Sequence, residues 1–131
     1  MKTGKPITTP LPDEMEPQAS EKWALYRIIC PIVDTSCHFS GLEPYFEYPQ
    51  PTGPNSVIKV DIALLTEQKK PIWYIEAKKF ARPIHRAMIE GYLRDDLMGV
   101  VSNGNNWIFV IMGKAFTVGP ILDNSNKPID A

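Results

Sequence analysis

The stretch of residues 57–78 reads VIKVDIALLTEQKKPIWYIEAK and decides the fold. Two apolar runs, rich in β-branched residues, are separated by the polar segment 66–70, which predicts two strands joined by a turn. Side chains alternate between the faces of a strand, so Glu76 and Lys78 are expected to share a face. Asp61, inside the first run, is then expected beside Glu76 on the neighbouring strand. The stretch therefore predicts two carboxylates and an ammonium at the end of a hydrophobic sheet, where isolated charges are costly unless they are paired or bound to a metal.

Composition limits the class of protein. The chain has 131 residues and 44% hydrophobic content, which suits one globular domain with a real core. The net charge is −1, so any nucleic-acid-binding surface must be local. No apolar run reaches the roughly 20 residues needed to span a bilayer, and the N-terminus lacks a signal pattern. We therefore expect no membrane partner and a cytoplasmic location.

The ends of the chain differ in composition from its middle. Residues 1–18 contain four prolines among Thr, Lys and Glu and are expected to form a flexible tail. Residues 19–122 are expected to form the folded domain, and residues 123–131 a C-terminal tail.

The first half of the domain predicts a helix and a short strand. Ser20 is a suitable helix cap, and helically spaced apolar residues follow up to Pro31, which predicts a helix over 20–30. Segment 31–41 is expected to be irregular. Residues 45–48 predict a short aromatic strand, and the proline-rich segment 49–55 is expected to be a loop.

The second half predicts another helix and three strands. A helix is expected from Pro83 onward, with one apolar face formed by Ile84, Ala87, Met88, Gly91 and Tyr92. Strands are expected at 100–102, 107–111 and 115–118, with a turn at 103–106. This order of elements predicts an α/β domain with a central mixed sheet flanked by helices.

Two cysteines and two histidines raise the question of a disulfide or a zinc site. Without an export signal, Cys30 and Cys37 are expected to be reduced thiols, with Cys30 in the core. A zinc site formed by these cysteines with His38 and His85 lacks the close ligand spacing of known zinc motifs, so none is predicted.

The charged residues allow a structural and a chemical interpretation. An exposed Glu76–Lys78 ion pair would contribute little to stability, and such pairs occur in many sheets. In the chemical interpretation, Asp61, Glu76 and the main-chain carbonyl of Ala77 supply the hard oxygen ligands that suit Mg²⁺, with Mn²⁺ as a substitute. The metal would activate a water for phosphodiester hydrolysis, and Lys78 would hold that water or the developing charge.

The order of these residues resembles a known superfamily. Asp61 followed by Ile75-Glu76-Ala77-Lys78 is similar to the PD-(D/E)xK nuclease core, and most similar to the N-terminal nuclease domain of type I restriction enzyme R subunits. Those domains also have a helix that begins with Glu, a later helix with Gln and Tyr, and a strand pair with Thr/Ser-Asn-Gly-x-x-Trp. The corresponding residues here are Glu21, Tyr92 and the segment 102–107, SNGNNW. The resemblance covers roughly residues 20–118.

The resemblance implies a restriction-endonuclease-like fold and a Mg²⁺-dependent endodeoxyribonuclease that acts on DNA. It adds Glu21 to Asp61, Glu76 and Lys78 as a catalytic candidate, although an acid in a first helical turn is also explained by the helix dipole. The sequence departs from the family at Met88, where Gln is usual, and Glu90 or His85 are the polar residues that could replace it.

Several alternatives stay open at this point. A non-catalytic nucleic-acid-binding or assembly module on the same fold is the second interpretation, and a structural protein with a coincidental triad is the third. DNA is not distinguished from RNA, nor endonuclease from exonuclease action. A homodimer is compatible with double-strand cleavage, which needs two sites. A basic set usually forms a solvated surface, but several residues of the set here flank the proposed site and could contact a phosphate backbone: Lys69, Lys70, Lys79, Arg82, Arg86 and Arg94.

Overall fold

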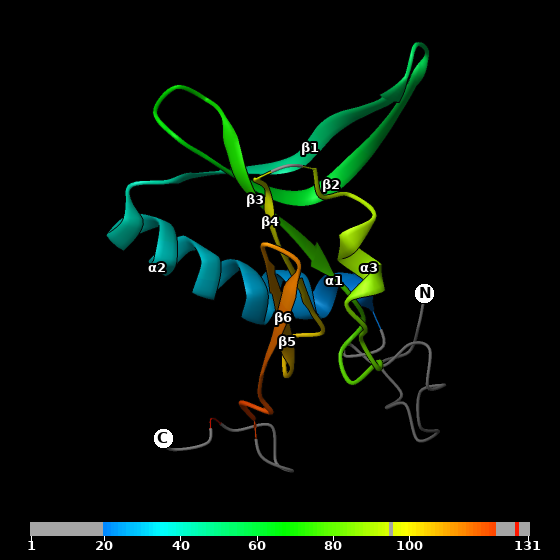
Figure 1. Ribbon diagram of the computed structural model, residues 1–131. Coiled ribbons are helices and arrows are strands. Elements are labelled where there is room, and N and C mark those ends of the chain that lie inside the picture. Colours follow the sequence, from blue (N-terminus) through cyan, green and yellow to red (C-terminus); the bar gives the residue numbers. More distant parts are fainter. Residues whose placement is uncertain (1–19, 95, 123–127, 129–131) are drawn as a thin grey trace, which may run out of the picture.

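The protein is a mixed α/β domain built on one sheet. The computed structural model describes residues 20–94, 96–122 and 128, so the N-terminal tail and all but one residue of the C-terminal tail lie outside the described part. Within that part, the sheet has six strands in the order β1-β2-β3-β4-β5-β6 (Figure 1). Neighbouring strands are antiparallel except β3 and β4, which are parallel and are joined by the crossover that contains α3. The expectation of a mixed sheet with helices is confirmed at this level.

Each predicted strand is present, and the largest difference in length is in β1. The strands are β1 Glu43–Gly53, β2 Ser56–Leu65, β3 Pro71–Ala77, β4 Met98–Ser102, β5 Trp107–Ile111 and β6 Lys114–Val118. The two apolar runs of the 57–78 stretch form β2 and β3, and they pair antiparallel with Ile62 opposite Ile75 and Leu64 opposite Trp73.

The first helix is twice as long as the sequence predicted. It comprises α1 Glu21–Ala24, the π-helical segment η3 Leu25–Ile29, and α2 Cys30–Ser40, so the expected stop at Pro31 and the irregular segment 31–41 are wrong. Pro31 lacks an N–H and its ring crowds the carbonyl four residues before it in a regular α-helix. The π turn directly before Pro31 widens the helix at this point, and the helix continues until Gly41, whose φ of 75° forms a left-handed cap.

Strand β1 runs through a segment that was expected to be a loop. Residues 49–53 pair with β2 despite Pro49 and Pro51, and only Pro54 and Asn55 form the turn. β1 is an edge strand of the sheet, where a missing N–H can face solvent without breaking a ladder. The prolines are therefore accommodated by the position of β1, which the sequence alone does not reveal.

The second helix is shorter than predicted. α3 spans only Ala87–Glu90, and the residues from Pro83 to Arg86 and from Gly91 onward lie outside it. The apolar side chains still face the sheet, because Ile84, Met88 and Tyr92 pack against the cluster that contains the fully buried Ile89. The predicted apolar face is confirmed for Ile84, Met88 and Tyr92 and wrong for Ala87 and Gly91, which are exposed, while Ile89 is the residue that is fully buried.

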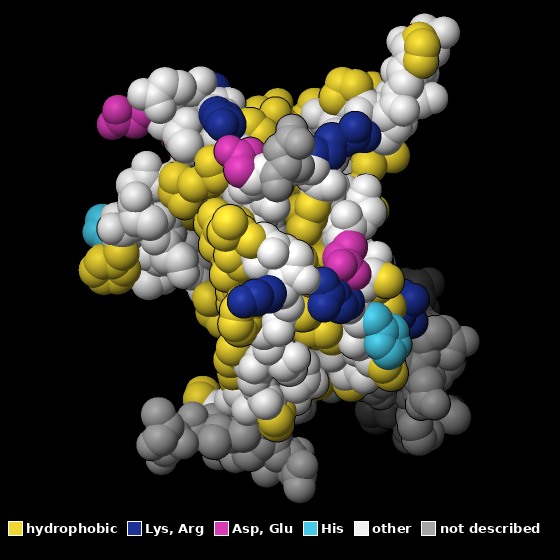
Figure 2. All heavy atoms as spheres, in the orientation of Figure 1, with side chains coloured by type: hydrophobic (Ala, Val, Ile, Leu, Met, Phe, Trp, Pro, Cys, Tyr) yellow, Lys and Arg dark blue, Asp and Glu magenta, His cyan; other side chains and the backbone are white. Residues whose placement is uncertain are grey.

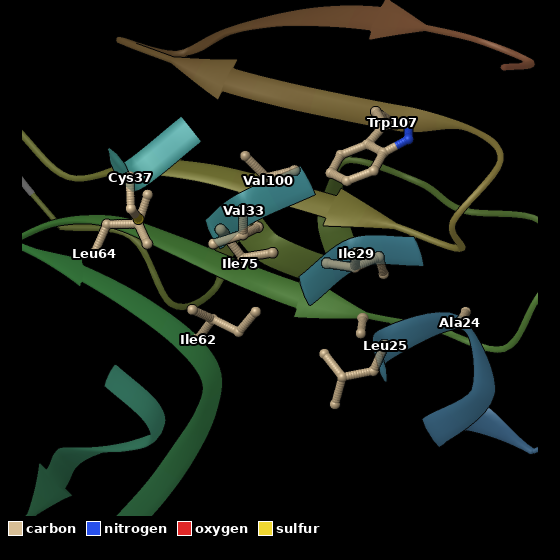
Figure 3. Close-up of a cluster of buried hydrophobic side chains, with 11 residues drawn as sticks. Ala24, Leu25, Ile29, Val33, Cys37, Ile62, Leu64, Ile75, Val100 and Trp107 are labelled. Carbon is tan, nitrogen blue, oxygen red and sulfur yellow. The ribbon is translucent and has the colours of Figure 1, made fainter. Parts of the chain in front are cut away.

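Each face of the sheet has its own core. The long helix covers one face, with Leu25, Ile29 and Val33 pointing at Ile62 and Ile75 (Figure 3). The segment around α3 covers the other face, where Ile89 packs with side chains of β2, β3, β4 and β5. The sheet is therefore the middle layer of three, and both clusters are needed to bury its two faces.

The helix does not cover the whole of its face. An apolar groove of about 430 Å³ lies between α2 and the strands, with Ile32, Trp73 and Phe109 in its lining. Hydrophobic side chains reach the surface between α2 and the β5–β6 hairpin (Figure 2). In the described part of the chain, no helix is long and apolar enough to cross a bilayer.

The contact between β4 and the α3 segment gives a test of this packing. A Cβ on Gly99 would lie 2.6 Å from Cγ1 of Ile89 and 2.9 Å from Cδ1 of Leu93. Gly99→Ala is therefore expected to lower the free energy of unfolding by about 1–3 kcal/mol through overpacking. Gly91→Ala is the matched control, because Gly91 has helical φ and a Cβ there would meet nothing within 4 Å.

Urea unfolding of both variants provides the measurement. The control is expected to be neutral or to gain up to about 1 kcal/mol through reduced entropy of the unfolded chain. Equal stability of the two alanine variants would show that β4 and the α3 segment are not in close contact.

Candidate functional site

The candidate site lies where strands β2 and β3 separate. Their regular pairing ends at Ile62 and Ile75, and beyond this point side-chain carboxylates take the place of ladder partners. The N–H of Ala77 donates to Oδ2 of Asp61 at 2.8 Å, and the N–H of Asp61 donates to Oε1 of Glu76 at 3.4 Å. Each carboxylate therefore accepts a backbone hydrogen bond from the opposite strand. This reciprocal contact confirms the predicted juxtaposition of Asp61 and Glu76.

The alternation of faces along β2 changes at Asp61. Ile62 belongs to the core under the long helix, whereas Val60, two residues away, belongs to the core on the other face. On β1, the position opposite Asp61 is Glu47, whose φ of 55° lies in the left-handed region. Both strands are thus irregular at this level. The irregularity explains how Asp61 can direct its carboxylate sideways, between the strands, instead of into a core.

Lys78 is part of the same group of charges. Its Nζ lies 3.5 Å from Oε2 of Glu76, and the side chains of Lys78 and Glu76 are only 20% and 10% exposed. The N–H of Lys78 also donates to the carbonyl of Ser102, 2.8 Å away, which extends the pairing of β3 with β4. A half-buried, fixed ion pair of this kind differs from the exposed surface pair of the structural interpretation.

The electrostatics of the site centre on Glu76. Burial raises the pKa of Glu76 from its ordinary value of 4.5 to about 7, and the nearby carboxylate of Asp61 adds to this rise. Lys78 and the backbone hydrogen bond from Asp61 act in the opposite direction but do not cancel it. Two carboxylates that share one site are difficult to ionise together, and an additional cation relieves this conflict.

Tyr92 and Cys30 approach the carboxylates from other elements. Burial raises the pKa of the Tyr92 phenol, and the charges of Glu76 and Asp61 raise it further. Burial likewise raises the pKa of the Cys30 thiol, with smaller contributions from Asp34 and Asp61. Tyr92 was expected to pack on the apolar face of its segment, and it does so while also lying near the acidic pair.

The donor atoms fit a hard divalent cation. The N–H of Ala77 points toward Asp61, and the C=O of a strand residue points to the same side as its N–H, so the Ala77 carbonyl is directed toward the carboxylates. Carboxylate and carbonyl oxygens are the ligands that Mg²⁺ prefers, usually with several waters. Within the described residues, no group of three or more His, Cys, Asp or Glu side chains could hold a metal. A metal here would therefore have few protein ligands.

The remaining site residues of the sequence prediction have different outcomes. Glu21 begins α1, but its side chain lies outside the described part of the structure. Met88 packs in the core, as an apolar side chain should. Glu90 pairs with Arg86 at 2.9 Å, and Arg86 also donates to the carbonyl of Gly113, so this group lies by the β5–β6 turn. His85 is exposed.

The basic residues expected around the site are dispersed. Lys69 and Lys70 lie in the β2–β3 turn, where they pair with Glu43 and Asp96 at 3.3 Å. This turn is at the opposite end of β3 from Glu76, about 20 Å away at 3.3 Å per residue. Arg86 belongs to the β5–β6 turn region described above. Lys79 and Arg82 follow the site directly in the chain, so they are the members of the set that flank it in sequence.

The turn between β4 and β5 supports the site in a way that the sequence did not reveal. Asn103 is 2% exposed, and its side-chain amide donates to the carbonyl of Arg82 at 2.7 Å. In the sequence, segment 102–107 indicated only a turn and a resemblance to the Thr/Ser-Asn-Gly-x-x-Trp pattern. Its sequence predicts a turn correctly, but nothing in it indicates which distant backbone the Asn103 side chain contacts.

The raised pKa of Glu76 predicts how stability depends on pH. The folded state binds more protons than the unfolded state between pH 4.5 and about 7, so the metal-free protein should lose stability as pH rises through this range. A shift of this size corresponds to a loss on the order of 3 kcal/mol. Glu76→Gln removes the titrating group and should flatten this part of the profile.

Melting temperatures from pH 4.5 to 7.5 in the presence of a chelator test this expectation. Glu43→Gln is the matched control, because Glu43 forms an exposed pair with Lys69. A wild-type profile that rises over this range would contradict a raised pKa for Glu76.

Comparison of the chain with family models, with curated proteins and with solved structures gave no match. The fold that is shown is a mixed α/β domain with a six-stranded mixed sheet and few helices. What the site does must be inferred from its residues.

Proposed function

We propose that this protein is a metal-dependent nuclease that hydrolyses phosphodiester bonds of DNA, on a restriction-endonuclease-like core. The observation that carries the proposal is the pair of carboxylates, Asp61 half-buried and Glu76 buried, each of which accepts a backbone hydrogen bond from the opposite strand, with Lys78 beside Glu76. Two acids and one base that are partly withdrawn from water leave an excess negative charge, which is unfavourable for stability alone. A site that binds a cation accounts for this cost.

Each residue has a task in such a reaction. Asp61, Glu76 and the carbonyl of Ala77 would hold Mg²⁺, or Mn²⁺ in its place. When bound, the metal supplies a Lewis acid for the scissile phosphate and lowers the pKa of a water. Lys78 is held beside Glu76 and carries a positive charge that stabilises the developing negative charge at the phosphorus. Lys79 and Arg82 lie next in the chain and are exposed, so they are available to contact phosphates.

One uncharged side chain and two backbone groups support the acidic pair. Tyr92, in the segment after α3, lies near enough to the pair for both charges to raise the pKa of its phenol, and this phenol can donate a hydrogen bond. Backbone N–H groups of Asp61 and Ala77 fix the orientation of both carboxylates. These contacts preorganise the oxygens before a metal arrives, which reduces the entropic cost of binding.

A second function is favoured by the apolar Met88, which stands where the resembled family has a polar Gln. A nucleic-acid-binding or assembly module on the same fold would need no catalysis. It would, however, have no use for the partly buried Asp61–Glu76–Lys78 group, whose charges destabilise the fold if no ligand binds. The nuclease is therefore the first proposal, and the two functions are separated by the measurements below.

The proposed function first predicts that the protein binds a divalent metal. Mg²⁺ or Mn²⁺ at a hundredfold excess over its dissociation constant should stabilise the wild type by roughly 2.7 kcal/mol. Asp61→Asn should abolish most of this gain, because the amide can still accept the hydrogen bond from Ala77 but has no charge. Thermal melting with and without metal measures the effect.

The control for metal binding is Glu43→Gln, which removes an exposed carboxylate far from the site. It should keep the full response to metal. An identical response in the wild type and in Asp61→Asn would exclude Asp61 as a ligand.

Catalysis is the second prediction. Lys78→Met keeps the aliphatic stem and removes the charge, so the fold and metal binding should survive while cleavage falls by about 10²–10³. The assay is single-turnover cleavage of duplex and single-stranded DNA in Mg²⁺ or Mn²⁺. It is run near pH 8, because loss of Lys78 raises the pKa of Glu76 further and both variants must have Glu76 ionised.

Lys69→Met is the matched control, since Lys69 is exposed and lies in the β2–β3 turn, at the opposite end of β3 from Glu76. It should cleave within a few-fold of the wild type. Equal rates for Lys78→Met and the wild type would refute the role of Lys78, and metal binding without any cleavage by the wild type would favour the binding module.

A further inference from the structure

The loop that follows Lys78 is short and strongly constrained. The N–H of Arg82 donates to the carbonyl of Lys79 at 3.1 Å, which closes a tight turn. Inside this turn Ala81 has a φ of 67°, a conformation that non-glycine residues seldom adopt. The ring of Phe80 packs edge-on against Trp23 of α1, with the ring centroids 5.1 Å apart. A strained turn of this kind persists only where its surroundings hold it.

Two consecutive residues at the end of β4 hold both ends of this loop. The carbonyl of Ser102 accepts from the N–H of Lys78 at 2.8 Å, and the side-chain amide of Asn103 donates to the carbonyl of Arg82 at 2.7 Å. The loop from Lys78 to Arg82 is therefore fastened at its start by main chain and at its end by one side chain. Asn103 is 2% exposed, so water does not compete for this bond.

The orientation of the Asn103 amide is determined by its other contacts. Its Oδ1 accepts from the N–H groups of Asn105 and Asn106, at 2.9 and 2.8 Å. The nitrogen must then point toward Arg82, where it meets a carbonyl oxygen. Both polar atoms of this side chain therefore join the β4–β5 turn to the loop after Lys78.

We propose that Asn103 is a positioning residue that closes the Lys78–Arg82 loop and thereby keeps the Lys78 ammonium beside Glu76. The catalytic consequence rests on the proposed nuclease function, whereas the closure of the loop does not. Without the bond from Asn103, the strained turn at Ala81 relaxes and the loop opens. Lys78 then loses its fixed position at the site.

The first test measures closure of the loop by limited trypsin digestion of the full chain. The bond after Lys79 lies in the loop, and the bond after Lys69, in the β2–β3 turn, provides an internal reference. Asn103→Ser keeps an oxygen that can accept from the turn N–H groups but is too short to reach Arg82. It should raise the rate of cleavage after Lys79 about tenfold relative to cleavage after Lys69, the effect of one lost buried hydrogen bond on local opening.

Asn103→Asp is the second variant, since it retains Oδ1 and replaces the donor by an oxygen that repels the Arg82 carbonyl. Asn105→Asp is its matched control. The Oδ1 of Asn105 accepts from Ile121 and Leu122, so the aspartate keeps both bonds while adding the same charge to the same turn. The control should retain wild-type trypsin rates after Lys79. Trypsin rates after Lys79 that stay at the wild-type ratio in both Asn103 variants overturn the proposal.

The second test measures catalysis in the same variants. Loss of position without loss of the Lys78 charge should lower kcat for DNA cleavage by about 10–10², with KM changed less than about twofold. Wild-type kcat in an Asn103 variant whose loop has opened would overturn the positioning role. If the wild type cleaves no nucleic acid, the proposed function fails, while the ratio of trypsin rates still decides whether Asn103 holds the loop.

Discussion

Where β2 and β3 separate, the carboxylates of Asp61 and Glu76 accept backbone hydrogen bonds from the opposite strand. The candidate site depends on this arrangement. In a regular ladder, Ala77 and Asp61 would bond to main-chain atoms of the opposite strand. Here the side chains of Asp61 and Glu76 take that place. The sheet can therefore open at this level without leaving buried N–H groups unpaired, which would be costly. The opening brings the two carboxylates near each other, and burial together with the charge of Asp61 raises the pKa of Glu76.

The rest of the fold supports this opening from both faces. The long helix packs against Ile62, Ile75 and Ala77, and the α3 segment packs against Val60 and Tyr74. The two cores anchor β2 and β3 on either side of the place where their pairing stops. The charges lie at the edge of both cores, shielded enough to interact strongly and accessible enough for a ligand to approach. Stability and the site therefore depend on the same strands.

The turn between β4 and β5 connects the site to the sheet. Its Ser102 and Asn103 contact the chain immediately after the Glu76–Lys78 pair, and Gly104 approaches Ile28 of the helix, where a Cβ would lie 3.0 Å from Cδ1. One turn thus touches the helix, the strand that bears the acid, and the loop that bears the basic residues. The residue types at Ser102, Asn103 and Gly104 are therefore constrained by these packing and hydrogen-bond contacts.

The sequence by itself determined the strands, the two-sided core and the neighbourhood of Asp61, Glu76 and Lys78, because alternation and hairpin pairing are local rules. The sequence failed at Pro31, where a π turn lets the helix continue. It failed at Pro49 and Pro51, where the edge position of β1 accommodates prolines. It also failed at the second helix, where packing on the sheet overrules the local helical preference. Only the tertiary structure decided that alternation changes at Asp61, that Lys69 and Lys70 lie far from the acids, and that Asn103 contacts Arg82. Those contacts join residues distant in the chain, and their geometry depends on how the layers pack, which no local pattern encodes.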